Sequence, residues 1–421
     1  MEPSLQSGHR RKRMQIGYLV PQFPGQTHIF FWRELRALVS AGITADIIST
    51  SRPPQGIVTH TWSQEAAERT TYLTETFARS LLPIITEIIR SGPSGWIRCL
   101  RAIQSTRDES RVRQIGLFLF GAALASRARQ QGWHHVHVHS CGDSANIAMF
   151  AALLSGLRYS LTLHGPLRDY GGNHAQKWGY ASFGIVITKQ LLEEVRSELG
   201  HDAPKRISVC PMGVDISVFS RKKPYEPACK TGTLRIFSCG RLNPCKGHVD
   251  LIDVVAALRG DGVDAQLEIA GEDEQGGSGY RQELAALIKS RGLSDYVTLA
   301  GAVPEEHVRQ SLDTCHVFAL LSIAEPLGVA IMEAMAMEVP VVITSSGGVA
   351  ELVTDGRDGI LVPPKDRRAT AEAIKSMATD GEKAFRLGVA ARSTIINQFQ
   401  SKRSAEAIIW ELQGIPSQAK Q

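Results

Sequence analysis

The most telling segment of this chain spans residues 322–333 and reads Ser322-Ile323-Ala324-Glu325-Pro326-Leu327-Gly328-Val329-Ala330-Ile331-Met332-Glu333. The apolar run 317–321 before it predicts a buried strand, and residues 329–337 predict a helix. Glu325 is therefore expected on the loop that leaves the carboxyl end of a strand, with Gly328 at the helix N-terminus and Glu333 about one turn inside the helix. Such a helix start suits a phosphate, because it offers unpaired N–H groups and the positive end of the helix dipole.

The two glutamates flank this phosphate position, and each carboxylate can accept hydrogen bonds from hydroxyl groups. A ligand with a sugar on one side, a diphosphate in the middle and a ribose on the other matches such a site. Two glutamates eight residues apart also arise by chance, and a solvated helix face would account for Glu333 alone. A second segment upstream favours the ligand site.

That second segment spans residues 237–248 and reads Phe237-Ser238-Cys239-Gly240-Arg241-Leu242-Asn243-Pro244-Cys245-Lys246-Gly247-His248. An apolar strand over 234–239 runs into the turn at Gly240, and a helix is expected to begin near Gly247. Arg241 can grip phosphate oxygens with its planar fork, while Lys246 places a compact charge beside it. A lone cation after a strand is usually a surface charge. Two cations at this spacing, about 80 residues before the glutamate pair, favour a diphosphate site.

The two segments resemble the E-x7-E and G-R-L…K-G elements of retaining glycosyltransferases that carry two Rossmann-like domains facing each other across a cleft, the GT-B fold. The likeness is to family 4, of the exopolysaccharide and colanic-acid-biosynthesis type. The resemblance implies that the G-R-L…K-G element holds the donor diphosphate, that Glu325 holds sugar hydroxyls and that Glu333 holds the ribose. The donor-binding residues that it implies are Gly240, Arg241, Lys246, Glu325, Leu327, Gly328, Val329 and Glu333.

The loop over residues 20–28 follows the first predicted strand and is expected at the cleft, where ligands of open α/β sheets bind. It resembles the P-x-F-P-x-x-[small]-E-T-F-I loop of the exopolysaccharide-type enzymes, and Arg33-Glu34-Leu35 continue the match. This chain departs from the pattern, because it has Gly25-Gln26-Thr27-His28 where Ser-Glu-Thr-Phe is usual. Gln26 keeps the length of Glu but not its charge. The resemblance places Gly25, Gln26 and Thr27 on the acceptor side of the cleft.

His164 ends a predicted strand over 159–163 and precedes Gly165. A single histidine at a strand end is more often structural than functional. The resemblance reverses this reading, because it places a His-Gly pair against the donor sugar, where a neutral imidazole would donate or accept one hydroxyl bond. The catalytic residues that the resemblance implies are Arg241, Lys246, Glu325 and His164.

A second predicted strand, over 136–139, is rich in histidine. His135, His137 and His139 would share one face of it, as the ligands of a metal do. No carboxylate or cysteine accompanies them at a familiar spacing, so no metal site is predicted. His139, at the strand end, is expected to line the cleft.

Strand-like runs alternate with helical stretches along the chain, as in parallel α/β layers, and 421 residues suit two domains. Further strands are predicted over 15–20, 46–49, 184–188, 207–210, 265–270, 297–300 and 339–344. The expected divisions are a basic tail over 1–13, an N-terminal Rossmann-like acceptor domain over 14–213, a hinge over 214–232, a C-terminal Rossmann-like donor domain over 233–398, and a C-terminal helix over 399–421 that could return to the N-terminal domain.

Charge is unevenly distributed between the two halves of the chain. Residues 1–222 contain 26 Lys and Arg against 16 Asp and Glu, and residues 223–421 contain 21 against 26. A basic first half suggests an anionic partner, and an anionic membrane surface fits better than nucleic acid because no nucleic-acid-binding motif is evident. Within 52–131, apolar residues alternate with arginines at helical spacing, as in helices that lie on membranes. Ordinary surface helices packed on the sheet would give the same pattern.

The sequence contains no apolar run near the roughly 20 residues that span a bilayer, and its basic N-terminus lacks the apolar run of a secretory signal. Seven scattered cysteines form no C-x-x-C pair and suggest neither a disulfide framework nor a zinc site. The expected location is the cytoplasm, peripheral on the inner face of the membrane.

The resemblance implies a retaining hexosyltransferase that moves a sugar from a nucleoside diphosphate to a hydroxyl of a surface-glycan or lipid-linked acceptor. No D-x-D-like metal site is evident, so Arg241, Lys246 and the helix start at Gly328 are expected to stabilise the leaving diphosphate without a metal or another cofactor. The alternatives are a nucleotide-sugar epimerase or a sugar phosphorylase on the same fold, and a non-catalytic glycosyltransferase-like binding module.

Overall fold

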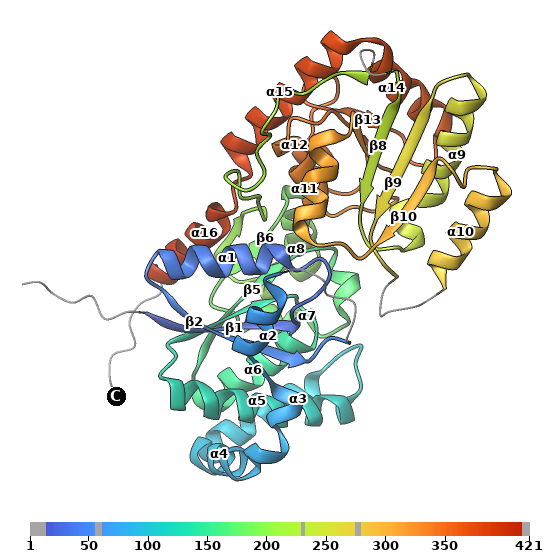
Figure 1. Cartoon of the computed structure of the whole chain (residues 1–421). Coiled ribbons are helices and arrows are strands. Elements are labelled where there is room, and N and C mark those ends of the chain that lie inside the picture. The colour runs from blue at the N-terminus through green and yellow to red at the C-terminus, as the bar shows by residue number, and fades with distance from the viewer. Residues whose placement is uncertain (1–13, 55–60, 229–231, 274–278, 415–421) are drawn as a thin grey trace, which may run out of the picture.

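The computed structural model describes residues 14–54, 61–228, 232–273 and 279–414, and it contains two α/β domains (Figure 1). The first has a seven-stranded sheet in the order β3-β2-β1-β4-β5-β6-β7, and the second a six-stranded sheet in the order β10-β9-β8-β11-β12-β13. All neighbouring strands pair in parallel. The strands are β1 (Gln15–Gln22), β2 (Thr44–Ser51), β3 (Thr70–Tyr72), β4 (His135–His139), β5 (Arg158–Leu163), β6 (Gly184–Val186), β7 (Ile207–Val209), β8 (Leu234–Cys239), β9 (Ala265–Ala270), β10 (Val297–Gly301), β11 (Val317–Leu320), β12 (Val341–Thr344) and β13 (Ile360–Val362).

Helices cover both faces of each sheet. Those of the first domain are α1 (Ile29–Ser40), α2 (Ser63–Arg69), α3 (Leu73–Thr76), α4 (Leu81–Ser105), α5 (Arg111–Gln131), α6 (Asp143–Ser155), α7 (His174–Gly179) and α8 (Lys189–Leu199). Those that follow are α9 (His248–Gly260), α10 (Tyr280–Ser290), α11 (Glu305–Thr314), α12 (Val329–Ala336), α13 (Val349–Leu352), α14 (Arg367–Thr379), α15 (Gly381–Gln398) and α16 (Lys402–Gln413).

The prediction of two Rossmann-like domains is confirmed, and all predicted strands are present. Strands such as β11 and β12 are recognisable as short, fully buried runs, because helices bury both faces of a parallel sheet. Two strands, β3 and β13, were not predicted. Each has three residues and lies at the edge of its sheet.

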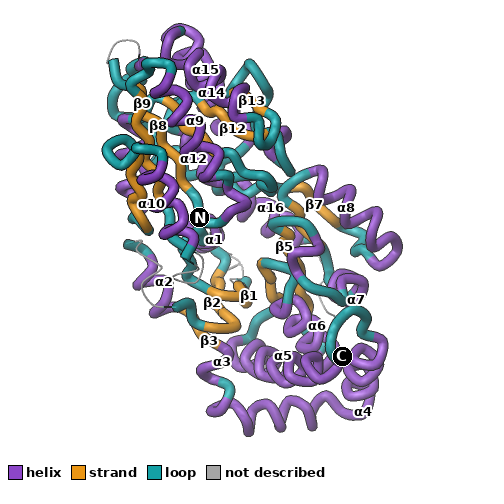
Figure 2. Tube along the Cα trace, turned by 90° about the vertical axis from the view of Figure 1, so that its right-hand side faces the viewer, coloured by secondary structure: helices purple, strands orange, loops and turns teal. Residues whose placement is uncertain are grey.

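The long stretch between β3 and β4 folds mainly into α4 and α5, which pack on each other and on α6 at the outer end of the first domain (Figure 2). The apolar run near residues 115–125 becomes the interior of α5, where an added Cβ on Gly121 would lie 2.6 Å from Phe150 Cβ of α6. α4 is kinked at Gly92, whose φ is 62°. Within the described residues, no helix has the length and apolarity needed to cross a membrane.

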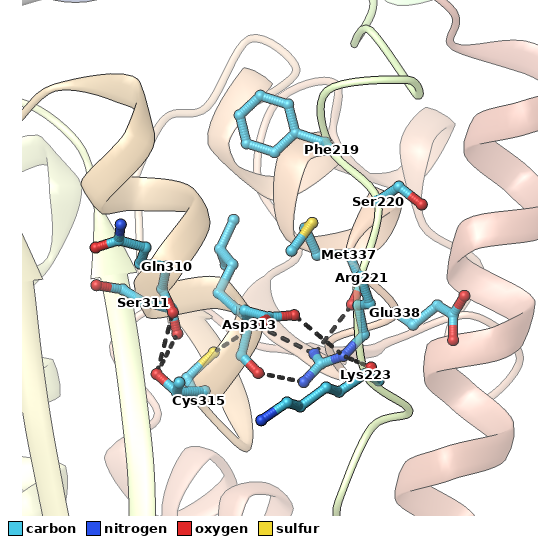
Figure 3. A network of polar contacts seen from close by, with 12 residues as sticks. Phe219, Ser220, Arg221, Lys223, Gln310, Ser311, Asp313, Cys315, Met337 and Glu338 are labelled. Carbon is cyan, nitrogen blue, oxygen red and sulfur yellow. Dashed lines mark hydrogen bonds and ion pairs between the residues drawn. The ribbon is translucent and has the colours of Figure 1, made fainter.

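Two segments cross between the domains. One lies in the predicted hinge over 214–232. It is anchored by Arg221, which donates to the carbonyls of Leu312 and Asp313 in α11 and of Met337 after α12 (Figure 3). A guanidinium suits this place, because the last carbonyls of a helix have no partner within the helix. At the other crossing, α16 returns to the first domain and packs on α1. The basic tail over 1–13 and the last part of the predicted C-terminal helix, 415–421, lie outside the described residues.

Candidate active site

Glu325 lies on the loop between β11 and α12, as the sequence predicts. A second loop holds its backbone, since Gly348 N donates to Glu325 O over 3.0 Å. An added Cβ on Gly347 would lie 2.2 Å from the same carbonyl oxygen. Gly328 begins α12 with a φ of 92°, a backbone conformation that favours glycine. Two glycine-dependent turns therefore set the position of the glutamate and of the helix start.

Lys246 and Glu325 bring the two sequence motifs into direct contact. Lys246 Nζ lies 2.7 Å from Glu325 Oε2, and Ser322 Oγ donates to the same oxygen over 2.9 Å. The backbones also touch, because an added Cβ on Gly247 would lie 2.0 Å from Leu321 O. Both charged side chains are mostly buried, so they form a fixed pair at the start of α12.

Arg241 extends from the turn after β8 toward the first domain. It is exposed, and the turn is tightly packed because an added Cβ on Gly271 would lie 1.9 Å from Gly240 O. Burial and the nearby charge of Arg241 lower the pKa of His28 to about 4. The loop that carries His28 and the turn that carries Arg241 thus face each other across the two domains.

The loop with Gly25, Gln26 and Thr27 lies at this boundary, as predicted. Gly25 O accepts a hydrogen bond from His28 N over 3.1 Å, and the His28 ring covers Gly25 so closely that an added Cβ would lie 2.4 Å from it. Gln26 is half-buried and Thr27 is exposed. A side chain at position 25 would therefore require the His28 ring to move.

Glu333 differs from the expectation that it is open to a ribose. Its Oε1 lies 2.7 Å from Nη2 of Arg33, a residue of α1 in the first domain. The same Nη2 lies 2.8 Å from Glu305 Oε2, and the Arg33 guanidinium stacks 5.0 Å from the centre of the Phe219 ring. Burial raises the pKa of Glu333, and Arg33 opposes that shift. The carboxylate therefore takes part in an ion pair between the two domains.

His164 lies at the predicted strand end, partly exposed, beside the second domain. The residue after it, Gly165, would bring an added Cβ within 3.7 Å of Pro326 Cγ in the loop of Glu325. The expectation that His139 lines the cleft was wrong, because its side chain is fully buried. It lies behind His164, with 3.0 Å between His139 Nδ1 and His164 Nε2.

β4, which carries His135, His137 and His139, does have a carboxylate beside it, although the sequence spacing did not reveal one. Glu34, from α1, places its carboxylate within 4.8 Å of ring nitrogens of His137 and His139. His137 also bonds two hydroxyl groups, those of Ser160 and Thr162. The signal for Glu34 was present in the sequence: it lies with Arg33 between the apolar residues Trp32 and Leu35, where charged residues are buried only when they have partners.

A further contact between the domains comes from Glu351. Its two carboxylate oxygens accept hydrogen bonds from Lys189 N over 2.7 Å and Gln190 N over 2.9 Å, at the start of α8. An acidic side chain is favourable there, because the first N–H groups of a helix have no partner within it. Glu351 thus caps a helix of the opposite domain.

This fold is that of glycosyltransferases of the GT-B type. Residues 221–394 match the family "Glycosyl transferases group 1". The chain is 34% identical to alpha-D-kanosaminyltransferase of Streptomyces kanamyceticus over 63% of its length and 74% of that protein. It is 27% identical to WcaL of Salmonella typhimurium, which is named as a glycosyltransferase of colanic acid biosynthesis, over 86% of this chain and 90% of the relative.

The fold is also shared with solved structures. HepE from Anabaena, crystallised in complex with UDP-glucose, superposes with a TM-score of 0.72 at 18% identity and covers 96% of this chain and all of its own. The chain belongs to the glycosyl transferases group 1, and it is a glycosyltransferase.

Proposed function

We propose that the protein is a retaining, metal-independent hexosyltransferase that moves a hexose from a nucleoside diphosphate to a hydroxyl of a surface-glycan or lipid-linked acceptor. The observation that carries the proposal is the ion pair of Lys246 with Glu325 at the start of α12. The complex of HepE with UDP-glucose supports a nucleotide-sugar donor, and the name of WcaL supports a glycan acceptor.

The leaving diphosphate needs its negative charge stabilised while the bond to the sugar breaks. Arg241, Lys246 and the N–H groups at the start of α12 supply positive charge and hydrogen bonds for it without a metal. Glu325 is engaged through Oε2 by Lys246 and Ser322, which leaves Oε1 to accept hydrogen bonds from sugar hydroxyls. In this scheme the acceptor hydroxyl gives its proton to the departing phosphate, on the face that the phosphate leaves.

Transfer assays with defined donors test this proposal. Nucleotide sugars that raise the melting temperature identify the donor, because a ligand of the folded state stabilises it by mass action. Each is then incubated with and without a lipid-linked glycan extract, and NMR of the product reports the anomeric configuration. Inversion, or loss of transfer in EDTA with recovery in magnesium, would contradict the mechanism. Isomerisation of the donor without an acceptor would support the epimerase alternative, and binding without turnover a non-catalytic module.

We also propose that the outer end of the first domain lies on an anionic membrane, where a lipid-linked acceptor would be found. Of the eighteen large apolar side chains that are exposed in the described part of the chain, nine lie between residues 81 and 115. They are Leu81, Leu82, Ile85, Ile89, Trp96, Ile97, Leu100, Val112 and Ile115. Exposed arginines accompany them at positions 90, 98, 101, 107, 111 and 113. Apolar contact together with charge attraction is how helices bind in the plane of a membrane surface.

A further inference from the structure

A chain of four polar side chains runs from the core of the first domain to the cleft. Tyr18 Oη donates to Glu34 Oε1 over 2.7 Å, and this oxygen lies 2.9 Å from His139 Nε2. His139 Nδ1 in turn lies 3.0 Å from His164 Nε2. The first three side chains are at most 2% exposed, whereas His164 is partly exposed at the end of β5. The chain therefore connects a buried carboxylate to a histidine at the cleft.

Aromatic packing holds the two imidazole rings in this arrangement. The His139 ring lies 4.5 Å from the Tyr18 ring and 4.6 Å from the Phe31 ring, measured between centroids. The His164 ring lies 5.3 Å from Phe31 and 5.2 Å from His139. Because the His139 ring is enclosed, it cannot rotate to exchange its two nitrogens without displacing its neighbours.

The positions of the protons follow from the carboxylate at the inner end. An ionised Glu34 only accepts hydrogen bonds. The His139 Nε2 contact with Glu34 is too bent to be a hydrogen bond, but a carboxylate oxygen 2.9 Å away still repels a lone pair on this nitrogen and attracts an N–H, so a neutral His139 has its hydrogen on Nε2 and a lone pair on Nδ1. His164 Nε2 must then donate to that lone pair. Burial lowers the pKa of both histidines well below the ordinary value, which keeps both rings neutral.

We propose that Glu34 and His139 are positioning residues that fix His164 as its Nε2–H tautomer, so that His164 Nδ1 accepts a hydrogen bond from a hydroxyl of the sugar substrate. The sugar ligand rests on the proposed function, whereas the tautomer does not depend on it. An acceptor nitrogen discriminates between ligands, because it pairs with a hydroxyl hydrogen and repels a carbonyl or carboxylate oxygen at the same place.

A bound metal is the competing explanation of this cluster, since Glu34, His137 and His139 lie close enough to share one. The hydrogen bonds of His137 favour the chain of polar side chains from Tyr18 to His164 over a metal site. Both ring nitrogens of His137 already bond hydroxyl groups, to Ser160 at 2.8 Å and to Thr162 at 2.9 Å. A metal would have to break one of these bonds and compete with Tyr18 for the carboxylate.

Nitrogen NMR of the full-length protein with 15N-labelled histidine tests the tautomer directly, with the His164 signals assigned by their loss in His164→Gln. We expect hydrogen on Nε2 in the wild type. Glu34→Leu and His139→Leu remove the acceptors and should produce a mixture of tautomers. Glu34→Gln and His139→Asn keep an acceptor oxygen near each lost atom and should restore the wild-type signal. His135→Gln is the matched control, because His135 is equally buried on the same strand but bonds Ser160 instead.

Kinetics then separate positioning from folding. We expect His139→Leu to lower kcat/KM by about 10- to 100-fold, as when the partner that orients a functional histidine is removed. His139→Asn should recover most of it. A series of monodeoxy donors then identifies the hydroxyl that contacts His164. With the donor that lacks this hydroxyl, the wild type and His139→Leu should have the same kcat/KM.

Each outcome is decisive for the inference. Hydrogen on His164 Nδ1 in the wild type, or an unchanged tautomer in the leucine variants, would overturn it. So would one equivalent of metal found by mass spectrometry and lost in His137→Ala. If no nucleotide sugar is turned over, the proposed function fails while the tautomer result stands. If the leucine variants do not fold, the wild-type spectrum and the Gln and Asn variants still decide the question.

Discussion

Arg33 and Glu333 form an ion pair between the two domains, with 2.7 Å between Nη2 and Oε1, and each side chain is less than 10% exposed. The pair joins α1 of the first domain to α12 of the second. Glu333 is the residue that the family resemblance assigns to the ribose of the donor. In the proposed function, Arg33 and the nucleotide therefore compete for one carboxylate, which couples donor binding to the contact between the domains.

Arg33→Gln tests this competition. We expect the affinity for the nucleoside diphosphate alone to rise by about tenfold in calorimetry, because the ribose no longer has to displace a guanidinium. The melting temperature should fall, since a buried carboxylate loses its partner. Arg36→Gln is the control, as Arg36 lies on the same helix but is exposed. Weaker binding in Arg33→Gln would mean that Arg33 contacts the nucleotide instead of competing with it.

Arg241→Ala and Lys246→Ala should each lower turnover by about 10²-fold or more, because each removes positive charge from the leaving group. Their effects on stability should differ. Arg241 is exposed and its loss should leave the melting temperature nearly unchanged, whereas Lys246→Ala leaves the buried Glu325 unpaired and should lower it. Wild-type turnover in either variant would contradict the diphosphate assignment.

Glu325→Gln and Glu333→Gln should separate the two sides of the donor. Glu333→Gln is expected to weaken binding of the nucleoside diphosphate, because a charged acceptor bonds ribose hydroxyls more strongly than an amide. Glu325→Gln should leave nucleotide affinity largely intact and impair use of the sugar donor. Calorimetry with nucleotide alone, followed by transfer kinetics, measures both. An equal loss of nucleotide affinity in the two variants would refute the division.

The buried histidines should make the protein sensitive to mild acid. Burial lowers the pKa of His135 to about 3 and, with Arg241, that of His28 to about 4, whereas in an unfolded chain histidine titrates near 6.5. Between these values the unfolded state binds protons that the folded state does not, so the free energy of unfolding is greatest above about pH 6.5 and falls as the pH is lowered toward 4. His135 alone should contribute a slope of about 1.4 kcal/mol per pH unit. Urea unfolding between pH 7.5 and 5.5 measures how the free energy of unfolding depends on pH. His135→Gln should make this dependence shallower. Equal slopes in the wild type and the variant would contradict the lowered pKa of His135.

Membrane binding should depend on lipid charge and on the apolar face of α4. The protein is expected to sediment with anionic liposomes at low salt and to be released at high salt, while neutral liposomes bind little. Ile89→Asp should weaken sedimentation, because it places a negative charge at the bilayer. Val389→Asp is the control, since Val389 is an exposed apolar residue on a helix of the second domain. Equal binding to both liposome types, or to neither, would remove the physical support for a membrane-bound acceptor.

Much of the fold and half of the site could be predicted from local patterns. Strands such as 234–239 and 265–270 were placed to the residue, because their buried apolar positions are followed directly by a glycine that ends the strand. The positions of Arg241, Lys246 and Glu325 at the carboxyl ends of strands followed from the same runs. A strand end, a glycine turn and a helix start are all encoded within about ten residues of one another.

The sequence alone therefore determined the two parallel α/β domains and the turns that carry Arg241, Lys246 and Glu325. Only the tertiary structure decided that Arg33 reaches Glu333, that Glu34 stands behind His139, and that His139 is buried while His164 meets the cleft. These contacts join residues up to 300 positions apart. The physical reason is that periodicity reports which face of an element is buried, whereas the partner of a buried charge is set by how two domains and their helices pack together.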